Sequence, residues 1–288
     1  MPQTINPIRK AVYLTFGMVL IASTAAAATK FASGYASVAA IITVQFLICL
    51  MICLPRILRV GIDGLKTQRP FLHLIRGGVG VLGFYLFYAC LNQIPMVDAM
   101  LLRQSAPLTV PLVMWAWGGD QVSRSVWWPL IIGFVGILVI LRPSPEGLSI
   151  WHLAGLVSAF TLSLSMVATR KLAPTEPPSR ILFYYFVLSL LCVAPFSIGD
   201  YAALPWQAWL AMIYVGISIY FAMVLYNRVY SMAPASAVAP VNYFAVVFTG
   251  FWGWLLWDQV PDAWTLAGSV LVIAGGLMTI QLSRTEKA

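Results

Sequence analysis

The sequence predicts an all-α integral membrane protein with ten transmembrane helices, built as two inverted five-helix repeats. Three observations support this prediction: an apolar composition, ten apolar stretches of membrane-spanning length, and a tripeptide that recurs late in the chain. Of the 288 residues, 61% are apolar and 9% are charged. Soluble domains typically carry about 25% charged residues, so this composition excludes a soluble domain.

The internal repeat is marked by Asp120-Gln121-Val122, which recurs as Asp258-Gln259-Val260, 138 positions later. Further matches at nearly the same offset pair Ala28-Thr29-Lys30 with Ala168-Thr169-Arg170, Pro95 with Pro234, and Gly136 with Gly275. A constant offset from the first helix to the last indicates duplication. We therefore expect a first five-helix repeat over residues 1–145 and a second, inverted one over residues 146–288.

The ten apolar stretches follow one another with short connections, and each approaches the roughly 20 residues that span a hydrocarbon core. They begin near Ala11, Gly34, Gly77, Ala99, Val126, Leu148, Ile181, Trp206, Ser236 and Ala263. The first stretch follows two basic residues and ends in small ones, so it also has the layout of a cleavable secretory signal. Its repeat partner around Ala168 is internal, which favours a first helix over residues 11–30.

Five spans in each repeat give the two copies opposite orientations, an arrangement shared by many secondary transporters. Lys and Arg gather on the cytoplasmic side of membrane proteins. With the N-terminus inside, fourteen of them, Arg76 included, fall on the cytoplasmic side, against only Lys30 and Arg142 outside. We expect a multi-pass protein of the cell inner membrane with both termini in the cytoplasm. The net charge of +8 then reports topology, and no nucleic-acid partner is expected.

The cysteines and histidines, which commonly form metal or cofactor sites, predict no such site in this chain. The four cysteines all lie in apolar stretches and match no disulfide or metal motif: Cys49, Cys53, Cys90 and Cys192. The two histidines, His73 and His152, fall at predicted helix ends and have no partner at ligand spacing.

Several local motifs resemble the drug/metabolite transporter superfamily in its ten-helix EamA form. They are Ala28-Thr29-Lys30, Ser105-Ala106-Pro107-Leu108, the acidic residues Asp120 and Asp258, and Gly133-Phe134-Val135-Gly136-Ile137-Leu138. The resemblance covers nearly the whole chain and implies a small metabolite or drug-like substrate, moved by alternating access through a central cavity. The chain departs from the family pattern in having Asp at the usual Glu position and Gln45 where Arg is frequent.

Arg103 lies several residues inside the fourth stretch, where a central arginine costs about 2.5 to 3.5 kcal/mol on insertion scales. Two interpretations remain open. The side chain reaches the outer headgroups, or, helped by Gln104, it anchors a carboxylate or phosphate of the substrate. Asp98 is five positions away, about 140° around the helix, and is a poor partner.

Further candidate substrate-binding residues lie on equivalent helices of the two repeats. Tyr85 and Tyr88 share one face of the third stretch, and Tyr220 occupies the matching helix of the second repeat. Asn242 and Tyr243 lie in the ninth stretch. Tyrosines at helical spacing are also common packing residues, so a structural role for them stays open.

Proline supplies candidate hinges. Pro107 and Pro240 fall inside predicted helices, where each removes a backbone hydrogen bond and favours a kink. Residues 11–28 contain no acidic residue, and every Asp and Glu lies at or near a predicted helix end. This placement argues against a deep proton-binding carboxylate and leaves facilitated diffusion, exchange, or coupling through a group such as Asp98.

The function predicted from these features is secondary transport of a small organic metabolite, most simply an amino acid-like or other anionic or zwitterionic solute. Aromatic, nucleoside-like or drug-like compounds are the alternative substrates. A membrane-embedded enzyme lacks support because no Ser-His or Cys-His pair is placed to form a nucleophile. A receptor or an assembly subunit is a third class. The partners are the substrate and the lipid bilayer, with the chain a monomer or a homodimer.

Overall fold

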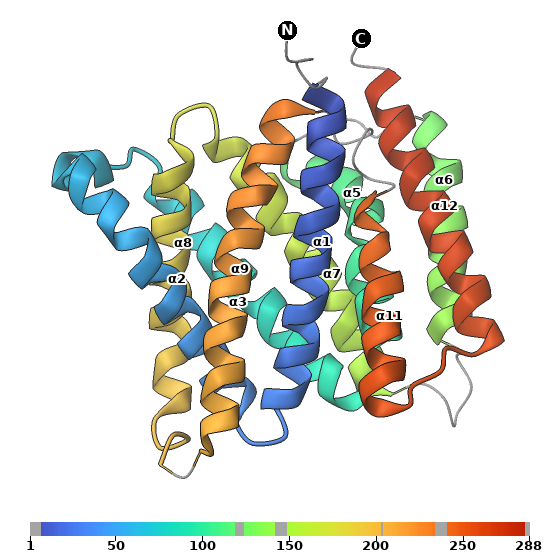
Figure 1. The fold of residues 1–288 in the computed structure, drawn as a ribbon. Helices are drawn as coiled ribbons and strands as arrows, with labels where there is room; N and C mark the ends of the chain where they lie inside the picture. The colour runs from blue at the N-terminus through green and yellow to red at the C-terminus, as the bar shows by residue number, and fades with distance from the viewer. Residues whose placement is uncertain (1–6, 119–123, 142–148, 203, 234–240, 286–288) are drawn as a thin grey trace, which may run out of the picture.

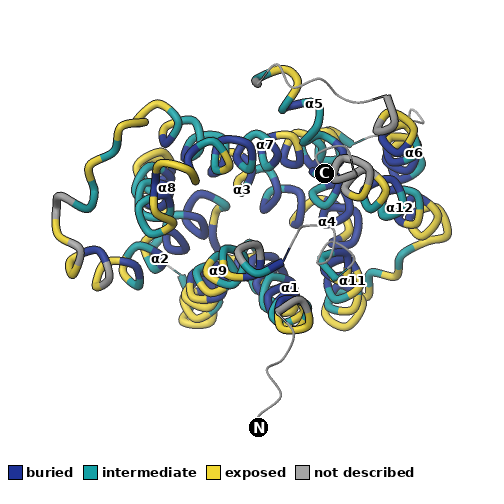
Figure 2. Tube along the Cα trace, turned by 90° about the horizontal axis from the view of Figure 1, so that it is seen from above, coloured by how far each residue is buried: buried dark blue, intermediate teal, exposed yellow. Residues whose placement is uncertain are grey.

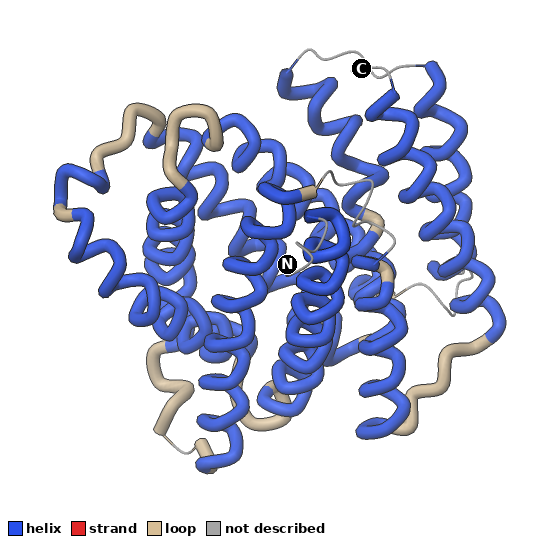
Figure 3. The backbone as a smooth tube through the Cα atoms, turned by 45° about the horizontal axis from the view of Figure 1, so that its top comes forward, coloured by secondary structure: helices blue, strands red, loops and turns tan. Residues whose placement is uncertain are grey.

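The computed structural model describes residues 7–118, 124–141, 149–202, 204–233 and 241–285. Every regular element in these residues is a helix, and no strand occurs among them (Figure 3). The α-helices are α1 (Pro7–Ala32), α2 (Val38–Val60), α3 (Pro70–Gln93), α4 (Met96–Gln104), α5 (Ala106–Gly118), α6 (Arg124–Leu141), α7 (Ile150–Leu172), α8 (Pro178–Val193), α9 (Trp206–Met232), α11 (Phe244–Trp257) and α12 (Ala263–Thr285). Two short 3-10 helices are η1 (Ile62–Leu65) and η2 (Ala194–Ser197).

Six helical spans within the described ranges are long and apolar enough to cross a membrane. They are Arg9–Ala32, Val38–Arg59, Pro70–Gln93, Ile150–Leu172, Pro178–Ser197 and Trp206–Val229. Shorter apolar helices cover Trp127–Ile140, Phe244–Trp257 and Ala263–Met278. The protein is therefore an all-helical, multi-pass membrane protein, as its composition predicts.

The helices form two rows when the bundle is viewed along its length. Figure 2 shows α9, α1 and α11 along one side, α3, α7 and α5 along the other, and α4 between the rows, in agreement with the packing of α4 against both α7 and α11. Helices α2 and α8 pack together at one edge, and α6 packs against α12 at the other. Helix α1 begins and α12 ends at the same end of the bundle (Figure 1).

Many large apolar side chains remain on the outside of this bundle. Leu58, Trp128 and Val270 are 71%, 72% and 67% exposed, respectively. Exposed apolar surface on this scale indicates contact with a membrane, because soluble monomers rarely carry it. The outer faces of the helices therefore suit contact with lipid. The polar side chains inside the bundle are the candidates for a functional site.

Local chemistry explains where α2 and α3 begin. The Ser37 hydroxyl accepts the N–H of Ala40 at 3.1 Å and caps α2, which starts later than the expected Gly34. Helix α3 starts at Pro70 and not near Gly77, because proline is well suited to the first helical turn. Arg76, counted among the loop cations in the sequence, consequently lies inside α3.

The fourth predicted stretch is interrupted at Ser105, which separates α4 from α5. Pro107 explains the interruption, because it has no N–H for the carbonyl of Arg103 and its ring crowds that carbonyl. The second half has a matching feature: Val241 and Asn242 are helical, Tyr243 forms a turn, and α11 starts at Phe244. The second candidate hinge, Pro240, lies outside the described residues.

Helices α6 and α12 approach closely because glycines line their interface. A Cβ added to Gly136 would lie 2.7 Å from the backbone nitrogen of Val272, and one added to Gly275 would lie 2.5 Å from that of Gly133. Gly136 and Gly275 are one of the pairs matched in the sequence repeat. Both glycines therefore lie in the α6–α12 interface, where any larger side chain would clash with the backbone of the other helix.

Candidate functional site

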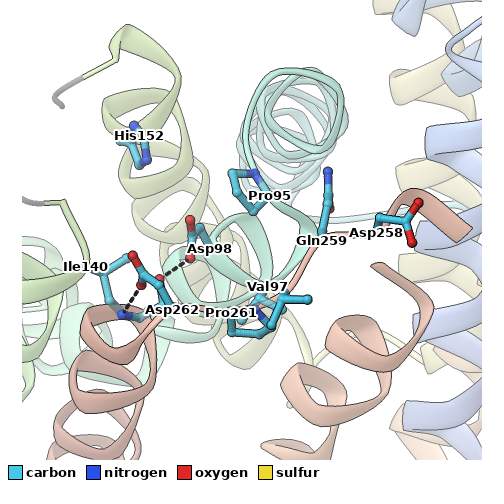
Figure 4. A pocket seen from close by; sticks show the side chains of 11 residues that line it. Pro95, Val97, Asp98, Ile140, His152, Asp258, Gln259, Pro261 and Asp262 are labelled. Atoms are coloured by element: carbon cyan, nitrogen blue, oxygen red, sulfur yellow. Dashed lines mark hydrogen bonds between the residues drawn. The ribbon is translucent and has the colours of Figure 1, made fainter. Parts of the chain in front are cut away.

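A cavity of about 450 Å³ opens at the end of the bundle where α4 starts and the α11–α12 connection passes (Figure 4). Three carboxylates, Asp98, Asp258 and Asp262, and the imidazole of His152 are among its lining groups. Thr265 joins two of the carboxylates: its hydroxyl donates to Asp98 at 3.0 Å, and its main-chain N–H donates to Asp262 at 2.9 Å. None of the substrate-binding residues expected from the sequence lines this cavity.

The second Asp-Gln-Val motif builds the rim of the cavity. Asp258 ends α11 in a left-handed conformation with φ of 54°, and Gln259 Oε1 accepts the N–H of Met96 at the start of α4 at 3.0 Å. The motif therefore joins the end of α11 to the first turn of α4, and this part of the cavity has a structural role. The first copy of the motif, Asp120-Gln121-Val122, lies outside the described residues.

Arg103 lies in the interior of the bundle, close to α3. Its Nη1 donates to the Gly83 carbonyl at 3.1 Å, and its guanidinium carbon lies 4.9 Å and 4.5 Å from the ring centres of Phe84 and Phe87. The described residues provide no carboxylate within ion-pair distance of this group. A partly buried guanidinium on aromatic rings keeps most of its donors for another partner, which suits an anion.

Tyr88, also on α3, lies in the same interior region. Its side chain is 2% exposed, its hydroxyl donates to Gln45 Oε1, and it interacts electrostatically with Arg103. Tyr85, by contrast, is 41% exposed, so the two tyrosines face different surroundings although they lie one turn apart. The structure thus brings Tyr88, and not Tyr85, together with Arg103.

Three more candidates, Gln104, Asn242 and Tyr243, form a second group next to α4. Gln104 Nε2 donates to the main-chain oxygen of Asn242 at 3.1 Å. Tyr243 is 6% exposed, and its hydroxyl has no hydrogen-bond partner among the described residues. That hydroxyl reaches α12, where a Cβ on Gly276 would lie 1.8 Å away. Gln104, Asn242 and Tyr243 therefore lie together at the two helix interruptions.

Tyr220 reaches the Arg103 region through a chain of aromatic rings. Its ring centre is 6.3 Å from that of Phe186, which is 5.8 Å from that of Tyr185. Tyr185 is 1% exposed and interacts electrostatically with Arg103. The three rings form a continuous row of aromatic contacts that leads toward Arg103.

Tyr185 and Arg76 are two further candidate site residues, which the sequence alone did not indicate. The Arg76 guanidinium carbon lies 3.9 Å from the centre of the Tyr185 ring, and its Nη1 donates to Ser165 Oγ at 2.7 Å. Depth inside an apolar helix, the signal that singled out Arg103, also applies to Arg76 once α3 is known to start at Pro70.

Two sets of hydrogen bonds join connections at the two ends of the bundle. Glu176, in the α7–α8 connection, accepts hydrogen bonds from Thr67 at 2.6 Å and from Arg180 at 2.7 Å, with His73 4.0 Å away. Burial opposes ionisation of Glu176, but the bonds from Thr67 and Arg180 outweigh it and hold its pKa below the ordinary range. The connection between α1 and α2 lies at the opposite end of the bundle (Figure 1). There, the Ser37 hydroxyl donates to Asp200.

The described residues hold no group of three or more His, Cys, Asp or Glu side chains able to bind a metal. What the geometry offers is an interior cation beside aromatic rings and neutral hydrogen-bonding groups, within a bundle of membrane-spanning helices. Such a site suits the reversible binding of a polar solute. Its position inside a bundle of membrane-spanning helices indicates that the protein is a membrane carrier.

The comparisons with known proteins agree with that class. The EamA-like transporter family matches residues 9–142 and again residues 149–281, and the chain belongs to this family. The pseudopaline exporter CntI of Pseudomonas aeruginosa is 32% identical over 225 residues, which cover 77% of this chain and 78% of the exporter. The family and its relatives are transporters, which sets aside the membrane-embedded enzyme.

Other relatives carry different solutes. An S-adenosylmethionine uptake transporter of Rickettsia bellii is 26% identical, covering 82% of this chain and 81% of that protein. A riboflavin transporter of Vibrio cholerae is 27% identical, covering 80% and 78%. A crystal structure of a protein with 21% identity matches with a TM-score of 0.64 over 97% of this chain and 99% of that one. That last likeness shows the fold alone.

Proposed function

We propose that this protein is a secondary transporter that moves an amino acid-like or other anionic or zwitterionic metabolite across the cell inner membrane by alternating access. The observation that carries this proposal is Arg103, an interior cation with no carboxylate among its described neighbours. An unneutralised charge at membrane depth is costly. An anionic group on the solute would offset that cost during each transport cycle.

Alternating access requires two units that can move against each other, and we assign these to residues 1–145 and 146–288. The packing of two helix pairs supports ten spans in two inverted five-helix repeats, because each pair joins a helix of one repeat to a helix of the other. In this scheme α7 is the repeat equivalent of α1, and α9 is the equivalent of α3. Helix α1 packs on α9, and its equivalent α7 packs on α3, as a repeated arrangement requires. The interruptions at Ser105 and Tyr243, 138 positions apart, support the same relation.

In this arrangement Arg103 binds the anionic group, while Gln104, Tyr88 and Asn242 supply neutral hydrogen-bonding groups. Tyr243, Tyr85 and Tyr220 complete the set as side chains that contact the solute in other stages of the cycle. Pro107 and Pro240 are the proposed hinges. The excess of Lys and Arg at one end supports cytoplasmic termini.

An aromatic or nucleoside-like solute is the second candidate. The observation in its favour is the row of rings from Tyr220 through Phe186 to Tyr185, which ends at Arg103. A flat ring would stack along this row, as offset and edge-to-face aromatic pairs do. The riboflavin transporter of Vibrio cholerae, a relative named for an aromatic vitamin, supports the same reading.

A stabilisation screen tests both candidates. The purified protein in lipid nanodiscs is heated with amino acids, organic anions, nucleoside derivatives and vitamins, because a bound solute raises the unfolding temperature. We expect anionic or zwitterionic hits that Arg103→Gln abolishes, while the matched control Arg69→Gln, an exposed arginine before α3, keeps them. Uptake of each hit into proteoliposomes, with and without a pH gradient, then measures transport and coupling. Anionic hits that survive Arg103→Gln contradict the proposal.

A further inference from the structure

Arg76 and Arg103 reach the same interior region from two different helices. The Arg76 guanidinium lies beside Gly80, whose added Cβ would be 2.8 Å from Nη1. Arg103 donates to the carbonyl of Gly83. Three residues of α-helix advance about 4.5 Å, so the two guanidinium groups lie on the order of 10 Å apart.

Tyr185 lies within reach of both cations. Its ring carries the Arg76 guanidinium at 3.9 Å, and its hydroxyl interacts electrostatically with both arginines. Nearby donors also lack partners: Gln45 Nε2 and Arg76 Nε are buried and make no hydrogen bond with any described residue. Buried donors of this kind are rare without a ligand or water to accept them. The region therefore presents unused donors as well as two positive charges.

No carboxylate balances these charges in the parts of the chain that the structure describes. Asp63 belongs to η1, between α2 and α3, and the other acidic residues of the described ranges lie at helix ends or in connections: Asp98, Glu176, Asp200, Asp258 and Asp262. Two like charges brought together in a poorly solvated interior disfavour one another. An arrangement with two cations and no anion is therefore completed by a solute that supplies two negative charges.

We propose that Arg103 and Arg76 form a two-point anion site, and that the transported solute carries two separate negatively charged groups, as a dicarboxylic metabolite does. This assignment rests on the proposed function, in which Arg103 is the primary anchor, and adds Arg76 and the second charge. A guanidinium binds a carboxylate through two parallel hydrogen bonds, so each end of the solute finds a matching fork. Tyr185 lines the space between the two ends.

The test compares a dicarboxylate with a probe that lacks one charge. Adipate and its monoamide, adipamate, have the same length and differ in one carboxylate. Each is added at up to about 10 mM to the protein in nanodiscs, and apparent Kd values are taken from the rise in unfolding temperature. We expect adipate to bind at least about tenfold more tightly than adipamate, a difference that one charge-assisted contact readily supplies.

Variants separate the two arginines. Arg76→Gln should weaken adipate to the level of adipamate and leave adipamate binding unchanged, whereas Arg103→Gln should abolish binding of both probes. Arg76→Lys should keep part of the preference, because it keeps the charge but loses the planar fork. Arg69→Gln is the control for removing a cation at the same end of α3. The unfolding temperature without probe verifies that each variant is folded.

Equal affinity of the wild-type protein for adipate and adipamate would overturn the two-point site. So would a preference for adipate that survives Arg76→Gln, or failure of adipate to stabilise the wild-type protein. If both probes bind equally and Arg103→Gln abolishes both, the single anchor of the proposed function stands and only the second point is wrong. If Arg103→Gln leaves both affinities unchanged, the proposed function itself is contradicted.

Discussion

Gln104 Nε2 donates a hydrogen bond to the main-chain oxygen of Asn242 at 3.1 Å, and these residues are 138 positions apart. The offset equals that of the repeated Asp-Gln-Val. Equivalent positions of two copies come into contact only near an axis that relates the copies. The contact therefore supports an axis at α4, beside the helix interruptions at Ser105 and Tyr243.

Replacement of Gln104 by Leu should slow transport and lower stability modestly. The change removes the donor to the Asn242 carbonyl, and one such hydrogen bond contributes about 0.5 to 1.5 kcal/mol. The rate of solute uptake into proteoliposomes and the unfolding temperature measure the two effects. Gln93→Leu, at the exposed end of α3, is the control and should change neither. Wild-type uptake in Gln104→Leu would remove this contact from the transport mechanism.

Gly275→Ala should destabilise the protein by about 1 to 3 kcal/mol, the range for added methyl groups in tightly packed interiors. The new Cβ would lie 2.5 Å from the Gly133 backbone nitrogen, so backbone has to move. Gly17→Ala is the matched control: it lies within α1, and nothing lies within 4 Å of its added Cβ. Alanine is the better helix former, so the control should be neutral or stabilising. Equal unfolding temperatures for the two variants would contradict this packing.

Glu176→Gln should destabilise the protein at neutral pH by about 1 to 3 kcal/mol, because it weakens the bonds from Thr67 and Arg180. The pKa of Glu176 is lowered, so its ionised form is favoured by the fold. Its contribution is complete above the ordinary carboxyl pKa and is lost as the pH falls through the lowered value. The difference in unfolding temperature between wild type and variant should therefore shrink below about pH 4.

The control for Glu176 is Asp200→Asn, which changes the exposed carboxylate at the opposite end. Its effect should be smaller, because exposed charged contacts contribute little. A constant difference between wild type and Glu176→Gln from pH 7 to pH 3 would show that the carboxylate acts by packing and not by charge.

The helical class and the special position of Arg103 followed from the sequence, because composition and the cost of a buried charge are local properties. The helix boundaries were predicted less accurately. The third stretch was expected near Gly77, but Pro70 already suits a helix start, and this shift moves Arg76 from a loop into the bundle. The fourth stretch was expected to be continuous or kinked, whereas Pro107 divides it at Ser105.

The contacts between helices that are distant in the sequence could not be predicted from the sequence. Tyr185 sits in an apolar stretch with nothing to distinguish it from a packing residue, and only the structure brings it to Arg76. Tyr85 and Tyr88 share a helical period, yet neighbouring helices bury one and leave the other exposed. Periodicity identifies a face of a helix, but the partners of that face depend on the tertiary arrangement.

Thr67 with Glu176 and Ser37 with Asp200 join connections at opposite ends of the bundle, and both contacts are made at once. The two contacts share no residue, so in the proposed alternating access one could break while the other stays intact. Such a cycle would never open a passage from one side of the membrane to the other. Ions would then find no continuous water path, and the potential across the membrane would survive each cycle.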